Sequence, residues 1–267
     1  MKKYGLCAFL ILLTPLFAAA SGAREGESFS YAEIDRIEID AVFLNVEVRG
    51  ENNPTVYMRS DLPEGTFFSP RNFEVKHEVI GSKLRVWIER ESIFSGGSGT
   101  LFFRVPSQTE LDVKTASGDV RISGISTSVM KAKSASGNMT ISDIDAEVTI
   151  GAISGDLTAR KLNGDLDLTT VSGDIELSTL RGRIFVSSIS GDIRGDDLLL
   201  EQSSNFKTVS GDIDLDLENA LDELHYVLST VSGRLKVGSI SATRGLEMGN
   251  SPLTLKGESV SGSQTYR

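Results

Sequence analysis

The sequence has very little cysteine or histidine, with one cysteine and two histidines in 267 residues. Cys7 lies close to the N-terminus, so the rest of the chain can form no disulfide and carries no thiol nucleophile. Neither His77 nor His225 has a cysteine or a second histidine at the spacing of a metal site. We therefore predict no metal, no cofactor and no catalytic triad.

Basic charge and long apolar runs are also scarce. The formal net charge is −10, from 27 lysines and arginines against 37 aspartates and glutamates. This excess of acid argues against nucleic acid as a partner, because a basic patch is the usual footprint of nucleic-acid binding. Outside the first residues, no apolar run approaches the length of about 18 residues that a membrane-spanning helix needs, so no transmembrane anchor is predicted.

Residues 1–23 have the pattern of a secretory signal peptide. Lys2 and Lys3 precede a short apolar run, and small residues around Ala20 and Ala23 offer cleavage sites. Cys7 lies too early to be a lipid-modified residue at such a site. The segment predicts an exported protein, located in the periplasm, on the cell surface or outside the cell.

The centre of the chain, 135–193, is a sequence repeat. Its apolar residues recur at steps of four, two and three, which gives a unit of nine residues and a pair of units every eighteen. Once in each pair the chain reads Ser-Gly-Asp or Ser-Gly-Asn. The predicted turn residues are Ser117, Gly118, Asp119, Ser154, Gly155, Asp156, Ser172, Gly173, Asp174, Ser190, Gly191, Asp192, Ser210, Gly211 and Asp212. A fixed period near twenty residues is typical of stacked repeat architectures.

The steps of this repeat indicate strands joined by corners. A two-residue step is strand alternation, and the longer steps carry the chain around a corner where glycine, serine and aspartate favour turns. We predict an all-β fold, a single-stack parallel β-solenoid (β-helix) of about 18-residue coils. The apolar residues of the repeat, including Ile153, Val171 and Ile189, are expected to point into its core, as are Val231 and Ile240 further along.

The pattern divides the chain into three parts. Residues 1–23 are the signal peptide, 24–110 a β-rich N-terminal cap without the nine-residue pattern, and 111–267 the β-solenoid repeat domain. Most aromatic residues lie in the cap, where Trp87 is expected to cover the first coil rather than to stack on a sugar. The polar tail Ser259–Arg267 is predicted to close the far end, because polar residues protect an exposed sheet edge.

Motifs in the repeat resemble those of a bacterial family, the putative adhesins. The similar features are the Thr-x-Ser-Gly-Asp-Ile pattern at 170–175 and 208–213 and the Val105-Pro106 step before the repeat. The resemblance covers roughly Ile34 to the C-terminus. It implies exported β-strand-repeat proteins that carry a domain of unknown function and lie in the envelope or outside the cell. It implies no catalytic residues.

The aspartates of the Ser-Gly-Asp turns allow two interpretations. In the first, each carboxylate accepts backbone amide hydrogens at its own turn, beside a column of serine hydroxyls. In the second, the column binds a divalent cation, as calcium-binding repeats do. We favour the first because the glycine and aspartate are adjacent here, and because Asn138 and Arg183 would interrupt a metal column.

A catalytic role is the alternative to a binding role. Asp196 and Asp197 interrupt the repeat, with Asp214 and Asp216 one coil away, and two carboxylates could act as acid and base on a glycosidic bond. We favour a solvated loop, because coils this short do not build a cleft. The predicted function is that of a non-enzymatic, adhesin-like scaffold that presents a repetitive surface to an envelope component, glycan or protein. The alternative is a β-helix polysaccharide lyase or hydrolase.

Overall fold

The computed structural model describes residues 21–23, 28–62, 73–90 and 98–267. Most of the predicted signal peptide, 1–20, lies outside these residues. Apart from one 3₁₀ turn at Leu221–Glu223, the regular structure of the described residues is β-strand, which confirms the all-β class. No helix in this part of the chain is long and apolar enough to cross a membrane.

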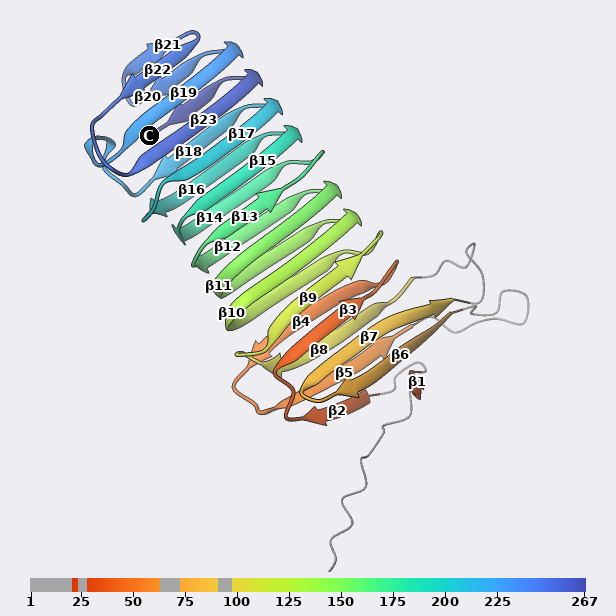
Figure 1. The fold of residues 1–267 in the computed structure, drawn as a ribbon. Coiled ribbons are helices and arrows are strands. Elements are labelled where there is room, and N and C mark those ends of the chain that lie inside the picture. The colour runs from red at the N-terminus through yellow and green to blue at the C-terminus, as the bar shows by residue number, and fades with distance from the viewer. Residues whose placement is uncertain (1–20, 24–27, 63–72, 91–97) are drawn as a thin grey trace, which may run out of the picture.

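The described strands belong to one continuous sheet that forms two long faces of an elongated body (Figure 1). We call the hydrogen-bonded strand orders of the two faces ladder A and ladder B. The two long strands β10 and β11 contribute one half to each ladder.

Ladder A runs in the order β2 (Ser28–Ala32), β5 (Thr55–Asp61), β8 (Thr100–Pro106), β4 (Asn45–Glu51), β10 (Val120–Ser136), β11 (Met139–Ser154), β12 (Leu157–Asn163), β14 (Ile175–Gly182), β16 (Ile193–Leu200), β18 (Ile213–Leu217), β24 (Gln264–Tyr266), β20 (Leu235–Val237) and β21 (Ile240–Ala242). Ladder B runs β1 (Ser21–Ala23), β6 (Phe73–Ile80), β7 (Lys83–Arg90), β3 (Arg36–Asp40), β9 (Glu110–Thr115), β10, β11, β13 (Leu166–Thr169), β15 (Ile184–Ser190), β17 (Ser204–Ser210), β23 (Thr254–Ser261), β19 (His225–Ser232) and β22 (Gly245–Met248).

The middle strands pair in parallel with a register of eighteen residues. Leu157 lies opposite Ile175, which lies opposite Ile193, and the same register holds in ladder B between Leu166 and Ile184. Equivalent apolar residues therefore stack on one another, and a slip of one residue would turn them all to solvent. The buried apolar side chains form one cluster that extends from Ile34 to Tyr266.

The bend within ladder A has a conformation that the sequence did not reveal. Asp143, Lys161, Thr179 and Asp197, eighteen residues apart, all have φ between 51° and 60°. In each coil the left-handed residue comes directly before a buried apolar residue, and this extra residue accounts for the three-residue step of the repeat. This conformation is costly for β-branched Thr179.

The expected inward direction of five apolar residues is wrong. Ile153, Val171, Ile189, Val231 and Ile240 are exposed. For the first four, the residue just before in the chain is buried instead, and these inward residues are Ala152, Thr170, Ser188 and Thr230. The reason is that strand alternation continues past the two-residue step as far as the turn serine, so the third apolar residue of the unit faces outward.

At both ends of the molecule the order of coils in space differs from their order in the sequence. The β3–β4 pair lies between β7–β8 and β9–β10, and the β23–β24 pair lies between β17–β18 and β19–β20. The polar tail is therefore an inner layer, and Gln264 and Tyr266 are fully buried. The prediction that this tail closes the end is wrong, because the antiparallel strands β21 and β22 cover that edge.

Candidate functional site

The predicted turn residues form a hydrogen-bonded column along the corner between ladders B and A. The Asp156 Oδ1 atom accepts the Asp174 amide at 3.0 Å, and Asp174 Oδ1 accepts the Asp192 amide at 2.9 Å. The same contact links the other members, in the order Asn45, Asp119, Asn138, Asp156 and, further on, Asp192, Asp212 and Ser263. Each carboxylate thus bonds to the next coil, and not to its own turn as expected.

The glycine of the turn is required by the distance between coils. Gly173 has φ of +118°, and a Cβ atom there would lie 2.2 Å from the Gly155 carbonyl oxygen. The serines beside it are at least partly accessible, and Ser172 and Ser190 are bridge partners. The Ser-Gly-Asp residues are therefore placed together at every coil, where they hold one coil against the next.

Part of the negative charge of the column is compensated by neighbouring arginines. The Asp192 amide and the Arg194 guanidinium, whose Nη1 lies 3.2 Å from Asp174 Oδ2, hold the pKa of Asp174 below its usual range. Arg194 also pairs with Asp192. The described residues contain no group of three His, Cys, Asp or Glu side chains with the geometry of a metal site.

The four carboxylates of the catalytic alternative are divided between different partners. The Arg267 guanidinium lies 2.6 Å from Asp214 Oδ1 and 3.9 Å from Asp216 Oδ2. Asp196 and Asp214 line a shallow cavity of about 420 Å³ that also contains Arg160, Arg194 and Arg267. Acid–base catalysis on a glycoside requires one protonated and one free carboxyl group on either side of the bond. In this cavity the three arginines lie among the three carboxylates Glu176, Asp196 and Asp214, and neighbouring positive charge favours the ionised form of a carboxyl group.

Asp197 lies apart from that cavity, at the bend of its coil. Its hydrogen bond to Glu218 raises the pKa of Glu218. Arg181 binds both carboxylate oxygens of Glu218, at 3.1 and 3.2 Å, and opposes this shift. Arg181, Asp197 and Glu218 thus connect neighbouring coils on the surface.

The histidines and the tryptophan have structural contacts. His77 is buried, and its Nδ1 lies 2.9 Å from the Tyr31 hydroxyl, whose own pKa is raised by burial. His225 Nε2 lies 3.3 Å from Glu247 Oε1, across the β19–β22 pair. Trp87 is half-buried on β7 beneath the Arg85 guanidinium, 5.2 Å from its ring.

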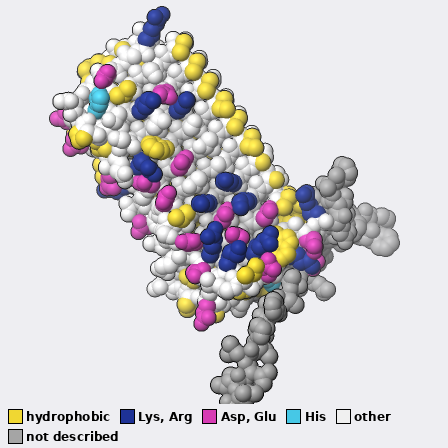
Figure 2. All heavy atoms as spheres, viewed as in Figure 1, with side chains coloured by type: hydrophobic (Ala, Val, Ile, Leu, Met, Phe, Trp, Pro, Cys, Tyr) yellow, Lys and Arg dark blue, Asp and Glu magenta, His cyan; other side chains and the backbone are white. Residues whose placement is uncertain are grey.

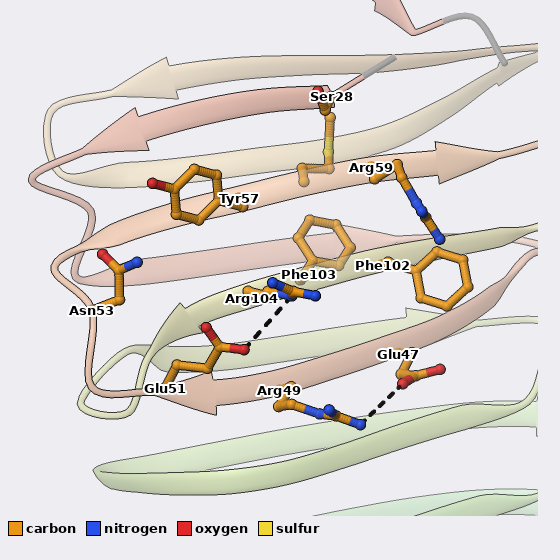
Figure 3. Close-up of a pocket in the computed structure, with 11 residues that line it drawn as sticks. Ser28, Glu47, Arg49, Glu51, Asn53, Tyr57, Arg59, Phe102, Phe103 and Arg104 are labelled. Atoms are coloured by element: carbon orange, nitrogen blue, oxygen red, sulfur yellow. Dashed lines mark ion pairs between the residues drawn. The ribbon is translucent and has the colours of Figure 1, made fainter. Parts of the chain in front are cut away.

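A pocket that sequence reasoning missed lies on the outer face of ladder A. It has a volume of about 490 Å³ and is lined by β4, β5 and β8 together with Ser28 of β2 (Figure 3). We call it the arginine pocket, because its lining includes Arg49, Arg59 and Arg104. The Tyr57-x-Arg59 and Phe102-x-Arg104 alternation puts an aromatic residue and an arginine on one strand face, and was the signal available in the sequence. No pattern in the sequence indicates that these strands are adjacent.

The charges in the arginine pocket are unequally paired. Arg49 Nη2 lies 3.8 Å from Glu47 Oε1, and Arg104 Nε lies 3.6 Å from Glu51 Oε1. The Arg59 guanidinium lies 4.8 Å from the centre of the Phe102 ring, and no carboxylate of the described residues is within ion-pair distance of it. Figure 3 shows the three guanidinium groups on neighbouring strands, with Arg59 apart from both glutamates. Among the described residues, the pocket therefore has one positive charge without a carboxylate partner, beside aromatic surface.

A second surface feature runs along the edge where the strands of ladder B end. Figure 2 shows a row of hydrophobic side chains there, beside the arrowheads of ladder B in Figure 1. We call it the apolar ridge. In spatial order its residues are Ile153, Val171, Ile189, Val209, Val260 and Val231, with exposed fractions between 39% and 74%.

Comparison with solved structures finds matches of low identity. A putative adhesin from Bacteroides fragilis NCTC 9343 is 14% identical with a TM-score of 0.48, over 92% of this chain and 98% of that one. A putative adhesin from Parabacteroides distasonis ATCC 8503 is 12% identical with a TM-score of 0.37, over 90% and 95%. A protein from the same strain described as a putative lipid binding protein is 12% identical with a TM-score of 0.35, over 92% and 98%.

No curated protein matches the chain. The model of one family, Toastrack DUF4097, matches residues 34–266. This match includes every strand from β3 to β24. The chain therefore belongs to the Toastrack DUF4097 family, and the resemblance seen in its Thr-x-Ser-Gly-Asp-Ile motifs is confirmed.

Proposed function

We propose that this protein is a non-enzymatic, exported scaffold that binds an acidic glycan of the cell envelope in the arginine pocket. The observation that carries the proposal is the Arg59 guanidinium, which lies over Phe102 without a carboxylate partner among the described residues. A planar guanidinium binds carboxylate or sulfate through two parallel hydrogen bonds. The bound anion would supply the charge that the pocket lacks.

The rest of the pocket suits a sugar. Tyr57 is exposed on β5, opposite Arg104, and Phe102 lies further along β8, opposite Arg59. Both line the pocket and offer aromatic surface to a sugar. Asn53 and Ser28 add neutral hydrogen-bonding groups at the edge. Aromatic packing with a few placed polar groups is typical of small-ligand sites.

Binding without turnover follows from the pairing of the acids. Glu47 and Glu51, the carboxylates of the pocket, both have arginine partners. Ion pairing favours the charged form of a carboxyl group, whereas a general acid has to be protonated. The alternative of a polysaccharide lyase or hydrolase has the same difficulty at Asp214 and Asp216, which share Arg267.

The proposal also covers the architecture of the scaffold and its location outside the cytoplasm. We interpret the parallel register of eighteen residues as a single-stack β-solenoid of which 24–110 is the cap and 111–267 the repeat domain. Residues 1–23 act as the signal for export. In this proposal the stacked Ser-Gly-Asp turns hold the coils together, and the outward-facing side chains of the strands form the surface that contacts the partner.

Calorimetric titration with polygalacturonate, and with neutral dextran as reference, tests the proposal. We expect the wild type to bind the acidic polymer alone, and Arg59→Gln to weaken binding at least about tenfold, or ~1.4 kcal/mol. Arg85→Gln is the matched control, because Arg85 also lies over an aromatic ring but outside the pocket. Equal binding by wild type and Arg59→Gln, binding of dextran, or shortening of either polymer would overturn the proposal.

A further inference from the structure

The apolar ridge is continuous even where the chain order is not. Thr208 pairs with Ser259 and Ser210 with Ser261, so Val209 and Val260 are neighbours on the outer surface. Thr230 and Ser232 pair with the same two residues, which puts Val231 on the other side of Val260. Strand β23, which comes from a later part of the chain, thus places Val260 in the ridge between Val209 and Val231.

The direction of the ridge residues opposes what burial alone would select. At each coil a small residue such as Thr170 or Ser188 faces the core, while the larger Val171 or Ile189 faces solvent. The Ser188 hydroxyl has no hydrogen-bond partner inside. The hydroxyls of Thr170, Thr208 and Thr230, by contrast, donate to carbonyl oxygens of the turns. The small polar residue therefore has a role at the corner, and the aliphatic residue beside it is left on the surface.

The ridge has uncharged sides at the coils of Ile153, Val171 and Ile189. The turn serines Ser154, Ser172 and Ser190 flank it on one side. Gly151, Thr169 and Ser187 are in register on the other side. At Val209 and Val260 the equivalent flanking residues are Lys207 and Glu258, which form an ion pair. Depletion of charge around an apolar centre is typical of protein interfaces, because little charge has to be desolvated when the partner arrives.

The spacing of the ridge decides between occupants. Its residues repeat at about 4.8 Å, the distance between neighbouring strands. An α-helix offers side chains at a pitch of about 5.4 Å, and an extended strand offers one face every ~6.7 Å, so either would lose register along six coils. The apolar ridge of a second copy has the same spacing, so its side chains can lie between those of the first ridge along all six coils.

We infer that the apolar ridge is the interface for a second copy of this chain, which packs ridge to ridge about a two-fold axis. Two-fold dimers use the same patch on both subunits, as a single self-complementary ridge allows. Each ridge exposes several hundred Å² of aliphatic surface, a size that marks interaction sites. Together with the flanking serines, two ridges bury on the order of 1,000 Å², the lower range of specific interfaces.

Analytical ultracentrifugation of the exported protein, over a concentration series, tests this inference. We expect a reversible dimer for the wild type, and for Ile189→Ser with Val209→Ser a dissociation constant at least about tenfold higher. Phe185→Ser is the matched control, since Phe185 is also exposed on β15 but lies off the ridge, and it should leave the dimer unchanged.

The results that would contradict the dimer come from ultracentrifugation of the wild type and the ridge variant, so they can be told apart from failure of the glycan proposal, which is tested at Arg59. A wild type that stays monomeric up to millimolar concentration overturns the inference, as does a ridge variant that dimerises like the wild type. Circular dichroism establishes that the variants are folded. If the wild type is monomeric and floats with phosphatidylcholine vesicles while the ridge variant does not, the ridge binds lipid and the dimer is wrong.

Discussion

At the scale of a residue, one hydrogen atom decides whether two coils can meet. The hydrogen of Gly173 faces the Gly155 carbonyl, where a Cβ atom would lie at 2.2 Å, and the backbone there has φ of +118°. Both the clash and the conformation exclude a side chain. The turn glycine is therefore set by contact with the neighbouring coil as well as by the turn itself.

We expect Gly173→Ala to lower the free energy of unfolding by at least about 2 kcal/mol, because the strained φ and the contact with a rigid backbone act together. Urea denaturation measures the change. Gly151→Ala is the control, because a Cβ at Gly151 meets only the Lys133 side chain, at 3.6 Å. It should change stability by no more than ~1 kcal/mol, in either direction. Equal effects of the two substitutions would contradict this account.

The same scale shows what a motif reveals and what it leaves out. Ser172-Gly173-Asp174 indicates a turn, since each residue type favours one. The acceptor role of Asp174 toward the Asp192 amide could not be read from the motif, because the partner belongs to the next coil. Arg59 and Phe102 illustrate the same limit, because 43 positions separate residues that adjacent strands bring together.

At the scale of the elements, the turn column links each pair of coils by one side chain. Asn138 replaces aspartate in this column and still accepts the Asp156 amide through Oδ1, at 2.9 Å. The acceptor oxygen is thus the shared requirement, and the charge is an addition that Arg194 uses. This distinction predicts how substitutions at Asp174 depend on pH.

We expect Asp174→Ala to cost about 1 kcal/mol at pH 7, because the Asp192 amide loses its acceptor. Asp174→Asn should retain most of that stability. The pKa of Asp174 is lowered in the folded protein, so its charge contributes stability above the ordinary aspartate pKa of about 3.9, and this contribution is lost as the pH falls through the lower folded value. The advantage of wild type over Asp174→Asn should therefore shrink below about pH 4.

Urea denaturation at pH 7 and pH 3 measures both effects. Asp167→Ala is the control, since Asp167 is an exposed aspartate on the neighbouring strand β13 with no ion pair or hydrogen bond from its side chain among the described residues. A cost for Asp167→Ala equal to that for Asp174→Ala would show that the amide contact is unimportant.

Strands also explain the largest error of the sequence-based prediction. The spacing Ile150 to Ile153 was interpreted as a corner, yet β11 continues to Ser154, so Ala152 is buried and Ile153 is exposed. An aliphatic residue next to a small one gives no sign of which faces inward when both suit a strand. The all-β class was predicted correctly, whereas one side chain was misplaced in each of the coils of Ile153, Val171, Ile189 and Val231.

At the scale of the whole molecule, the order of coils depends on contacts that no local pattern encodes. β23 and β24 lie between coils formed by earlier parts of the chain. Gln264 donates to the Ser229 carbonyl at 2.8 Å and accepts from the Tyr266 hydroxyl at 3.0 Å, with both side chains fully buried. The polar tail was predicted as an outer edge because such contacts between distant segments leave no periodic trace.

Deletion of 254–267 should separate the end of the molecule from the rest. Without β23 and β24, the strands β19 and β20 lose their parallel partners. We expect trypsin to cleave after Arg234 and Lys236 at least about tenfold faster than in the complete chain, because local unfolding exposes these sites. Lys161, in the middle of the stack, is the internal control and should be cleaved equally in both. Unchanged resistance at Arg234 would contradict the expectation.

The interleaved ends also impose a sequence of events in time. A ribosome delivers the chain from its N-terminus, yet β17 and β19 meet only through β23, which follows both of them in the sequence. Residues 225–248 therefore cannot pair with the main stack until β23 has been made and lies between β17 and β19. A chain interrupted before residue 254 therefore cannot form the last layers of the stack.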